Sequence, residues 1–523
     1  MYRQLTLDET ARLREQGCRC SNWEMISVDE GFDANGIRNV SFDGEIRIGS
    51  GVHMENIGII RTTDGASFGE GVTVGVKNEA GDGNVILYGA LTSQTAALMV
   101  RSCDDEQLFS RLRQMVEKYV SENVAACTTI GNDVTITDCR ELTNVSIGDG
   151  CELCGASRLI DCTLCPTPDA TIYIGDDVIM ENVIVQAGAT IVDGARLYDS
   201  FVGEACHVGR GFTSENSLFF ANSHMDNGES CAALCGPFSV SHHKSSLLIG
   251  GEYSFYNAGS GTNFSNHAYK MGPIHYGTME RGAKTASGAH ILWPAHIGAF
   301  SMAMGKIETH PDTSMLPFSY VIGNGRKTSV MPGQNLCTVG TYRDVTKWPK
   351  RDKRPQDGRK SLINFDWLSP YVIERIKAGA SFLDSLQEEQ GVDAEEYSCK
   401  GFTISSAALH RGMYFYDMAL RMYDGSMSTV EWTDMLGLLA PVETVQQIKE
   451  DVLTGNIDSI ETLESRFRDI YDSYAQWKGY DDNEAENDEA TEEWKDAIRR
   501  DAEREYDMGD VSEKQIAEFL ESV

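Results

Sequence analysis

The sequence predicts a mainly β protein: a left-handed parallel β-helix (a hexapeptide solenoid) with a helical insertion and an α-helical C-terminal domain. Apolar residues recur at steps of six over much of residues 39–342, the period changes to helical from Leu362, and 50 glycines against 12 prolines indicate many tight turns. Each six-residue step makes one short strand and one turn, so three steps close a coil. Coils of this kind bury a core only by stacking.

Residues 1–38 are predicted to form a short helix, from Leu7 to Glu15, followed by a loop. The repeat then begins. Ile48-Gly-Ser-Gly-Val52 and Phe68-Gly-Glu-Gly-Val72 share one pattern, in which an apolar residue and glycine precede two free positions and a small or β-branched residue. In a β-helix the apolar residue points inward and the small one fits the tight corner.

The repeat is interrupted at about residues 76–127, where we expect a helical insertion. Residues Asp104 to Glu122 have helical periodicity. One apolar stripe runs along this predicted helix: Leu108, Leu112, Met115 and Tyr119.

The repeat resumes at Ile130 and predicts a series of inward-pointing residues. They are Ile130, Ile136, Leu142, Ile147, Leu153, Leu159, Val185, Ile191, Leu197, Val202, Val208, Thr285, Ile291, Ile297 and Ala303. Phe220–His224 matches Phe238–His242 at a spacing of 18, which aligns these segments as successive coils. Met315–Gly325 is predicted to close the solenoid. A right-handed β-helix or a β-sandwich is the alternative, but neither favours strict steps of six.

Three segments are expected after the solenoid. Residues 343–362 form a basic linker, either solvated or a strap that meets a phosphate, and residues 363–480 form an α-helical domain. Residues 481–523 form an acidic tail that ends in a helix near Val511 to Phe519, with a disordered or solvated connector from Asp481 to Glu493. The helical domain contains one clear apolar stripe: Leu463, Phe467, Ile470, Tyr471, Tyr474 and Trp477.

Composition favours a cytoplasmic location. The net charge of −34 argues against nucleic acid and anionic membranes as partners. The first 20 residues lack the apolar region of a signal peptide. No apolar run approaches the ~20 residues that a membrane span needs. The 14 cysteines are therefore interpreted as reduced thiols.

The strongest functional signal is a concentration of histidines. Nine of the 11 lie between His207 and His310. The stretch Phe238–Gly272 combines histidines with small residues, asparagines, Lys244 and Lys270, and it has little other charge. A structural coil does not need these polar residues.

Within this stretch a set of intervals resembles the acetyltransferase half of the bacterial bifunctional glucosamine-1-phosphate acetyltransferase/uridyltransferase. The matching positions are His243, Asn257, Gly259, Gly261, Thr262 and Asn266. The resemblance implies that His243 is the general base, that acceptor-binding residues are Asn257, Asn266, His242 and Lys270, and that backbone amides near Gly259, Gly261 and Thr262 steady the oxyanion. If His243 is not the base, His242 is the next candidate.

The implied activity is transfer of an acyl group, acetyl first, from acetyl-CoA as co-substrate to a sugar, sugar phosphate or sugar nucleotide. The resemblance also implies a homotrimer, and no metal is expected. Ser246 replaces the family's tyrosine, and the nucleotidyltransferase half has no counterpart, so the acceptor need not be glucosamine-1-phosphate. The whole chain also resembles an uncharacterised hexapeptide-repeat family of Bacteroides-type bacteria. Its closing Pro317–Gly325 is similar to that of hexapeptide acyltransferases in general.

Three alternatives stay open. The first is a non-catalytic solenoid that binds sugars or assembles partners. The second is a zinc site at Cys151-x-x-Cys154 and Cys162-x-x-Cys165, although hydrophobic filling is favoured for these cysteines. The third is a γ-class carbonic-anhydrase-like zinc enzyme that uses His290 and His296.

Overall fold

A computed structural model describes residues 2–79, 81–124, 126–265, 276–426, 430–479, 484–507, 509 and 512–523. The chain divides into two compact units. Unit 1 comprises Met1–Gly251, Lys353–Leu362 and Lys449–Ser465, and unit 2 comprises Glu252–Asp352, Ile363–Ile448 and Arg466–Val523.

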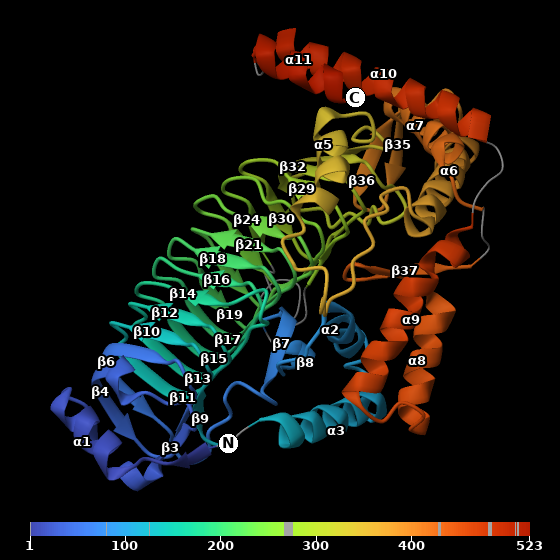
Figure 1. Ribbon diagram of the computed structural model, residues 1–523. Helices are drawn as coiled ribbons and strands as arrows, with labels where there is room; N and C mark the ends of the chain where they lie inside the picture. The colour runs from blue at the N-terminus through green and yellow to red at the C-terminus, as the bar shows by residue number, and fades with distance from the viewer. Residues whose placement is uncertain are drawn as a thin grey trace. The chain divides into compact units, whose positions relative to one another are not determined.

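Unit 1 is built on short parallel strands stacked in ladders (Figure 1). The first ladder, called ladder A, contains β6 (His53–Arg61), β10 (Thr135–Thr137), β12 (Glu152–Cys154), β14 (Tyr173–Ile174), β16 (Thr190–Ile191), β18 (His207–Gly209), β21 (His224–Asp226) and β24 (Val240–Ser241). From β10 onward, register partners follow one another at intervals of 16, 17 or 21 residues.

Two further ladders share the same long strands. The long strands are β11 (Glu141–Ile147), β13 (Arg158–Cys165), β15 (Ile179–Gln186) and β17 (Arg196–Val202). Their first halves stack in parallel, and the stack is extended by β19 (Thr213–Glu215), β22 (Glu229–Cys231) and β25 (Leu247–Ile249). Their second halves stack between β9 (Thr128–Ile130) and β20 (Leu218–Phe219), β23 (Leu234–Cys235).

The predicted inward residues form the core. From Ile130 to Val208 each has an exposed fraction of at most 2%, and in unit 2 Thr285, Ile291, Ile297 and Ala303 are also buried. Side chains alternate between the two faces of a strand, so the middle residue points inward in strands such as β10 and β12, whereas the two end residues point inward in β5 and β9. The apolar period therefore becomes a continuous buried column.

Asparagine and aspartate occupy many corners between the strands. Asn39, Asn56 and Asp138 have positive φ angles of 53°, 57° and 54°, a conformation that these two residue types tolerate better than most. Their side chains also join successive layers: Asn39 Nδ2 donates to Asn56 Oδ1, and Asn56 Nδ2 donates to Asp138 Oδ1, both at 3.0 Å. These residues thus form the turns and also link successive layers through side-chain hydrogen bonds.

The N-terminal prediction is partly wrong. Helix α1 spans Leu7–Glu15 as predicted, with a capping box from Thr6. The following segment is not only a loop, because it contains β2 (Arg19–Cys20) and β3 (Ile26–Asp29), which pair in parallel with β4 (Ile37–Asp43) and β5 (Ile46–Ile48). β1 (Tyr2–Gln4) pairs with β3 in the antiparallel direction. Alternate residues of β3 are buried, so the ladders begin before residue 39.

The interruption of the repeat contains the expected helix and two further elements. The expected helix is α3 (Glu106–Asn123), which Asp105 caps. The two further elements are an antiparallel hairpin, β7 (Thr73–Asn78) with β8 (Asp82–Ile86), and the buried helix α2 (Ser93–Val100). The ladders continue across the insertion, because β5 pairs with β9 and β6 pairs with β10.

Unit 2 also contains parallel strands. They are β26 (Glu252–Tyr253), β27 (Asn263–Ser265), β28 (Thr278–Met279), β29 (Lys284–Thr285), β30 (His290–Leu292), β31 (His296–Ile297), β32 (Met302–Ile307) and β33 (Tyr320–Asn324). β34 (Thr328–Met331) then pairs with β33 in the antiparallel direction, which ends the parallel ladder within Met315–Gly325 and the residues that follow it.

The C-terminal region is mainly helical: α5 (Val339–Lys347), α6 (Pro370–Gln390), α7 (Ser406–Met422), α8 (Val442–Thr454), α9 (Ile460–Lys478), α10 (Glu484–Asp507) and α11 (Glu513–Ser522). Two antiparallel hairpins interrupt it, β35 (Glu396–Cys399) with β36 (Phe402–Ser405), and β37 (Trp432–Met435) with β38 (Leu438–Pro441). Residues 363–480 are therefore not purely helical, and the predicted linker begins inside α5.

The predicted connector from Asp481 to Glu493 is wrong from residue 484 onward, where α10 begins; residues 480–483 lie outside the described residues. Within α10 the buried residues recur every fourth position: Ala490, Trp494, Ile498 and Ala502. Trp494 Nε1 also donates to the carbonyl of Leu336 at 3.0 Å. A narrow apolar stripe thus packs this helix against the protein, although the composition of the helix is strongly acidic.

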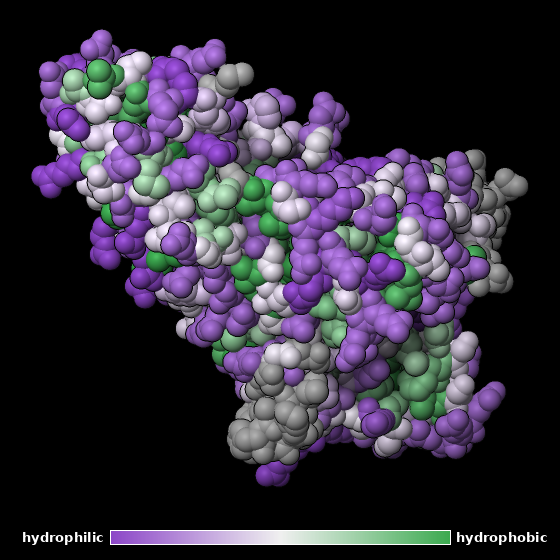
Figure 2. All heavy atoms as spheres, turned by 90° about the horizontal axis from the view of Figure 1, so that it is seen from below, coloured by the Kyte–Doolittle hydropathy of each residue, from purple (hydrophilic) through white to green (hydrophobic). Residues whose placement is uncertain are grey.

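No helix among the described residues is long and apolar enough to cross a membrane. Hydrophilic residues cover most of the face in Figure 2, and hydrophobic residues appear between them in small groups. All 14 cysteines are free thiols.

Candidate functional site

Three histidine-bearing segments of ladder A lie next to one another in unit 1. In the parallel pairing of β18 with β21, His207 is the register partner of His224, and Gly209 is the partner of Asp226. Because side chains alternate along a strand, these four residues lie on one face. Val208 and Met225 point to the other face and are fully buried.

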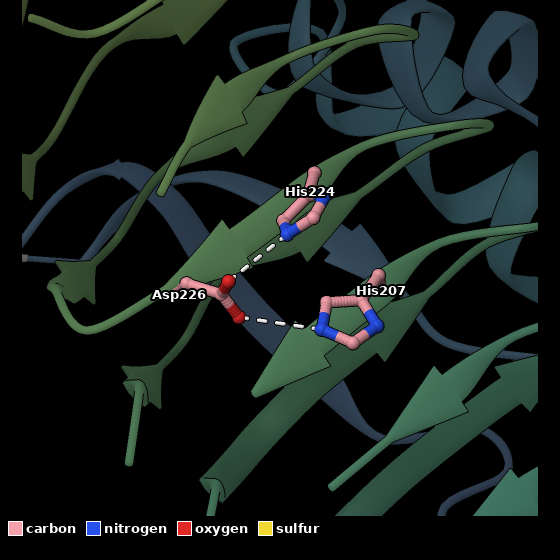
Figure 3. Close-up of side chains that lie close together, drawn as sticks. All are labelled: His207, His224 and Asp226. Atoms are coloured by element: carbon pink, nitrogen blue, oxygen red, sulfur yellow. Dashed lines mark hydrogen bonds and ion pairs between the residues drawn. The ribbon is translucent and has the colours of Figure 1, made fainter. Parts of the chain in front are cut away.

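Asp226 joins the two histidines. Its Oδ2 lies 3.0 Å from His224 Nε2, and its Oδ1 lies 3.3 Å from His207 Nε2 (Figure 3). The Asp226 side chain is 4% exposed, whereas those of His207 and His224 are 30% and 42% exposed. Arg210 Nε lies 3.5 Å from Oδ2. The Asp226 carboxylate is therefore buried in the surface of ladder A, and the two imidazoles beside it are partly exposed to solvent.

The imidazoles continue along the ladder. Ring centroids lie 4.5 Å apart for His207 and His224, 6.0 Å for His224 and His242, and 4.2 Å for His242 and His243. Burial, followed by the charge of His224, lowers the pKa of His207, although Asp226 acts in the opposite direction. Burial and the charges of His243 and His224 also lower the pKa of His242. This row is called the histidine row.

Gly209 leaves a gap beside the carboxylate. A Cβ built on this glycine would lie 3.0 Å from His207 Nε2 and 3.1 Å from Asp226 Oδ1. Both contacts are tighter than side chains normally allow. The glycine therefore keeps space open where the two polar atoms converge.

The residues of the predicted acetyltransferase site do not fall in one unit. His242 and His243 follow β24 in unit 1, where His243 is exposed and His242 is half-buried, whereas Asn257, Gly259, Gly261 and Thr262 belong to unit 2. Asn266 and Lys270 lie outside the described residues.

The Gly-x-Gly-Thr run has a structural explanation. A Cβ on Gly259 would lie 2.5 Å from the carbonyl carbon of Ala286, and Gly261 has a φ of +70°. The Gly259 amide donates to Thr285 Oγ1 at 3.1 Å, and the Thr262 amide donates to the Gly259 carbonyl at 3.2 Å. The Thr262 amide is used within the turn and the Gly259 amide is used by Thr285 of β29, so these two amides can meet an oxyanion only if they give up these bonds.

The sequence analysis missed Asp226 and matched the neighbouring strands incorrectly. The spacing of 18 aligned His224 with His242, but the structure pairs His224 with Val240 and Met225 with Ser241. The interval from β21 to β24 is 16 residues, two fewer than the spacing of 18 that the sequence comparison assumed. His207-x-Gly209 followed by His224-x-Asp226 was the available signal, because positions i and i+2 share a face of a strand.

The alternative metal sites are not assembled in the described residues. Burial raises the pKa of Cys151 and Cys162 to about 12 and that of Cys165 to about 11, which favours protonated thiols over metal-binding thiolates. His296 Nε2 is bonded to Glu280 Oε1 at 2.8 Å. Among the described residues, the group with metal-ligand geometry is His207, His224 and Asp226.

Comparison with known proteins identifies relatives without an assigned activity. A family model described as "Domain of unknown function (DUF4954)" matches residues 2–51 and 47–387, and a second, "Domain of unknown function (DUF6819)", matches residues 420–482. An uncharacterized protein of Treponema pallidum (strain Nichols) is 24% identical over 461 residues, covering 75% of this chain. The chain spans 63% of the length of that relative.

Proposed function

The chain belongs to the DUF4954 family, and we propose that it is an acyl-CoA-dependent transferase built on a left-handed parallel β-helix. The co-substrate is acetyl-CoA, and the acceptor is a sugar, sugar phosphate or sugar nucleotide. The active form is a cytoplasmic homotrimer, as the resemblance to hexapeptide acyltransferases implies. The parallel ladders, with register intervals near the 18 residues of three hexapeptides, support the fold. The 14 free thiols support a reducing compartment.

The observation that carries the proposal is the histidine pair at the end of β24. His243 is exposed in the turn after the strand, and its ring centroid lies 4.2 Å from that of His242. In the proposed reaction an acceptor amine or hydroxyl attacks the thioester carbonyl of acetyl-CoA. His243 takes the acceptor's proton, and coenzyme A leaves as the thiol once it regains a proton. His242 supports the His243 ring from one side.

Titration calorimetry with acetyl-CoA and with free coenzyme A tests the proposal before any acceptor is known. We expect both to bind to the purified full chain. A panel of amino sugars, sugar phosphates and sugar nucleotides then follows, with release of the coenzyme A thiol as the signal. We expect His243→Ala to retain acetyl-CoA binding and to lose roughly 10²–10⁴-fold in turnover, the usual contribution of a general base.

His53→Ala is a suitable control. His53 is exposed and occupies the same ladder A register column as His207, but at the other end of the ladder. It should leave turnover unchanged. If folded, trimeric protein binds neither acetyl-CoA nor coenzyme A, the transferase proposal is wrong, and a non-catalytic solenoid that binds sugars or partners becomes the better explanation.

A further inference from the structure

We propose that His207, His224 and Asp226 form a binding site for a divalent first-row transition metal, with Zn²⁺ as the best match. The proposal is independent of the transferase activity. It revises the sequence-based expectation that no metal binds. Two imidazole nitrogens and one carboxylate oxygen are a ligand set that zinc accepts, and a set of three leaves a fourth position for water or substrate.

The distances suit a tetrahedral centre. Zinc bonds nitrogen and carboxylate oxygen at roughly 2.0–2.2 Å, so adjacent tetrahedral ligand atoms lie ~3.4 Å apart. Asp226 Oδ1 lies 3.3 Å from His207 Nε2, close to the length of such an edge, and the other oxygen, Oδ2, lies 3.0 Å from His224 Nε2. Ligand atoms of all three residues lie within 4.8 Å of one another. The His207 and His224 imidazoles are partly exposed, so rotation of these side chains can bring any ligand atoms that lie up to 4.8 Å apart to the tetrahedral spacing.

Two further observations point to a ligand between these residues. Asp226 Oδ1 is buried and accepts no hydrogen bond from the described part of the chain, although His207 Nε2 is near. A buried acceptor without a donor is costly, so such an atom calls for an explanation. The gap kept open by Gly209 borders this same oxygen and His207 Nε2. A metal ion in contact with Asp226 Oδ1 and His207 Nε2 would give the buried oxygen a partner and would occupy the gap beside Gly209.

Two positively charged side chains near the site oppose the binding of a cation. Arg210 Nε lies 3.5 Å from Asp226 Oδ2, and the charge of Lys353 also acts on His207. Arg210 is 65% exposed, so solvent and salt screen its charge. Its contact with Oδ2 leaves Oδ1, the oxygen beside the gap, as the metal ligand. Binding also requires neutral imidazoles, so affinity should fall in acid.

The test is metal binding to the full chain after treatment with a chelator. Co²⁺ is titrated while its visible absorption is followed, and Zn²⁺ is then added as a competitor and measured by calorimetry. We expect one Co²⁺ per chain with the intense absorption of a four- or five-coordinate site, and displacement by Zn²⁺. His207→Ala and Asp226→Asn each remove one ligand and should weaken binding at least ~100-fold, since even loss of an outer-shell partner costs 10–100-fold.

Gly209→Ala is the sharper variant, because it removes no ligand and its φ is not in the left-handed region. Its methyl group fills the gap and also meets Val192 Cγ2 at 3.1 Å, so we expect a sharp fall in metal affinity, an unchanged circular dichroism spectrum and a small loss of melting temperature without metal. His53→Ala should bind as wild type does. Wild-type protein that binds no Co²⁺ or Zn²⁺, or binding that survives both His207→Ala and Asp226→Asn, overturns the proposal. His243→Ala separates the two proposals, because it should lower acetyl transfer roughly 10²–10⁴-fold and retain the metal.

Discussion

Arg354 and Glu204 form a buried ion pair in unit 1. Arg354 Nη1 lies 3.2 Å from Glu204 Oε2, and the two side chains are 2% and 6% exposed. Glu204 also accepts the backbone amides of Lys360 and Ser361 at 2.9 and 3.0 Å. The segment 353–362, expected as a linker, is therefore fastened to the end of β17 and the following turn by one carboxylate.

Arg354→Met should destabilise unit 1 by about 3–5 kcal/mol, because it leaves the Glu204 carboxylate buried without its cation. Urea unfolding followed by fluorescence and proteolysis of the 353–362 segment will measure the effect. Arg38→Met provides the contrast. Arg38 lies 3.5 Å from Glu55, its side chain is 64% exposed, and an exposed pair is worth ~0–1 kcal/mol. Equal losses in the two variants would contradict the assignment of Arg354 as an anchor.

Glu70 predicts a pH dependence of stability. Burial raises the pKa of Glu70 to about 7, although a hydrogen bond from the Gly89 amide and the charge of Lys360 act in the opposite direction. A carboxyl whose folded pKa lies above its unfolded value of 4.5 stabilises the fold below pH 4.5 relative to higher pH. That contribution is lost as the pH rises through about 7. The full loss is on the order of 3 kcal/mol at 1.36 kcal/mol per pKa unit.

Glu70→Gln removes the titration and keeps an oxygen that can accept the Gly89 amide. We expect little change in the urea midpoint at pH 4 and a higher midpoint than wild type at pH 8. Glu152→Gln, at an exposed position of β12, should follow the wild-type profile. If Glu70→Gln and wild type change in parallel across this range, Glu70 does not titrate as described.

His296 predicts the same direction of pH dependence in unit 2. Burial lowers the pKa of His296, but the hydrogen bond and charge of Glu280, with the charge of Asp312, outweigh it and raise the pKa overall. The stabilisation is complete below the unfolded value of 6.5 and is lost as the pH rises through the folded pKa. His296→Gln should flatten the unfolding profile between pH 6 and pH 9. A profile that is unchanged by the substitution would show that this pair does not contribute.

Gly259→Ala separates packing from catalysis in the Gly-x-Gly-Thr run. Its Cβ would lie 2.5 Å from backbone carbon of Ala286, so we expect a loss of at least ~1–3 kcal/mol, as in other overpacked sites. Thermal unfolding with and without acetyl-CoA gives the measurement. Gly340→Ala is the control, because Gly340, like Gly259, has no left-handed φ, and the heavy atom nearest to its added Cβ would lie 3.7 Å away, an ordinary contact. An unimpaired melting temperature with lost turnover would instead favour the predicted oxyanion role.

Much of the parallel architecture could be predicted, because its cause is local. Residues such as Ile136, Leu153 and Val208 repeat with the strand-and-turn period, and every one is buried. Helix α3 was predicted for the same reason, since its apolar stripe lies within one short segment, and α1 was predicted over the residues that it occupies. Helix α10 was missed because its stripe is narrow and most of its other residues are acidic.

The histidine row was only half visible in the sequence. His242 and His243 stood out by an interval pattern, whereas Asp226, two residues after His224, was not singled out. Its importance arises from the register between β18 and β21, which brings Gly209 opposite it and His207 opposite His224. A shift of β21 by one residue in that register would send His224 and Asp226 to the buried face.

The sequence by itself determined the period of the strands, the buried column of apolar residues and the change to helices after the ladders, because each depends on spacing within a segment. The tertiary structure alone decided which outward residues became neighbours. Turns of unequal length set the register between successive strands, and register places two imidazoles, a carboxylate and a glycine side by side. The chemistry at this surface depends on that register, which is a relation between strands and cannot be read from the sequence of one strand.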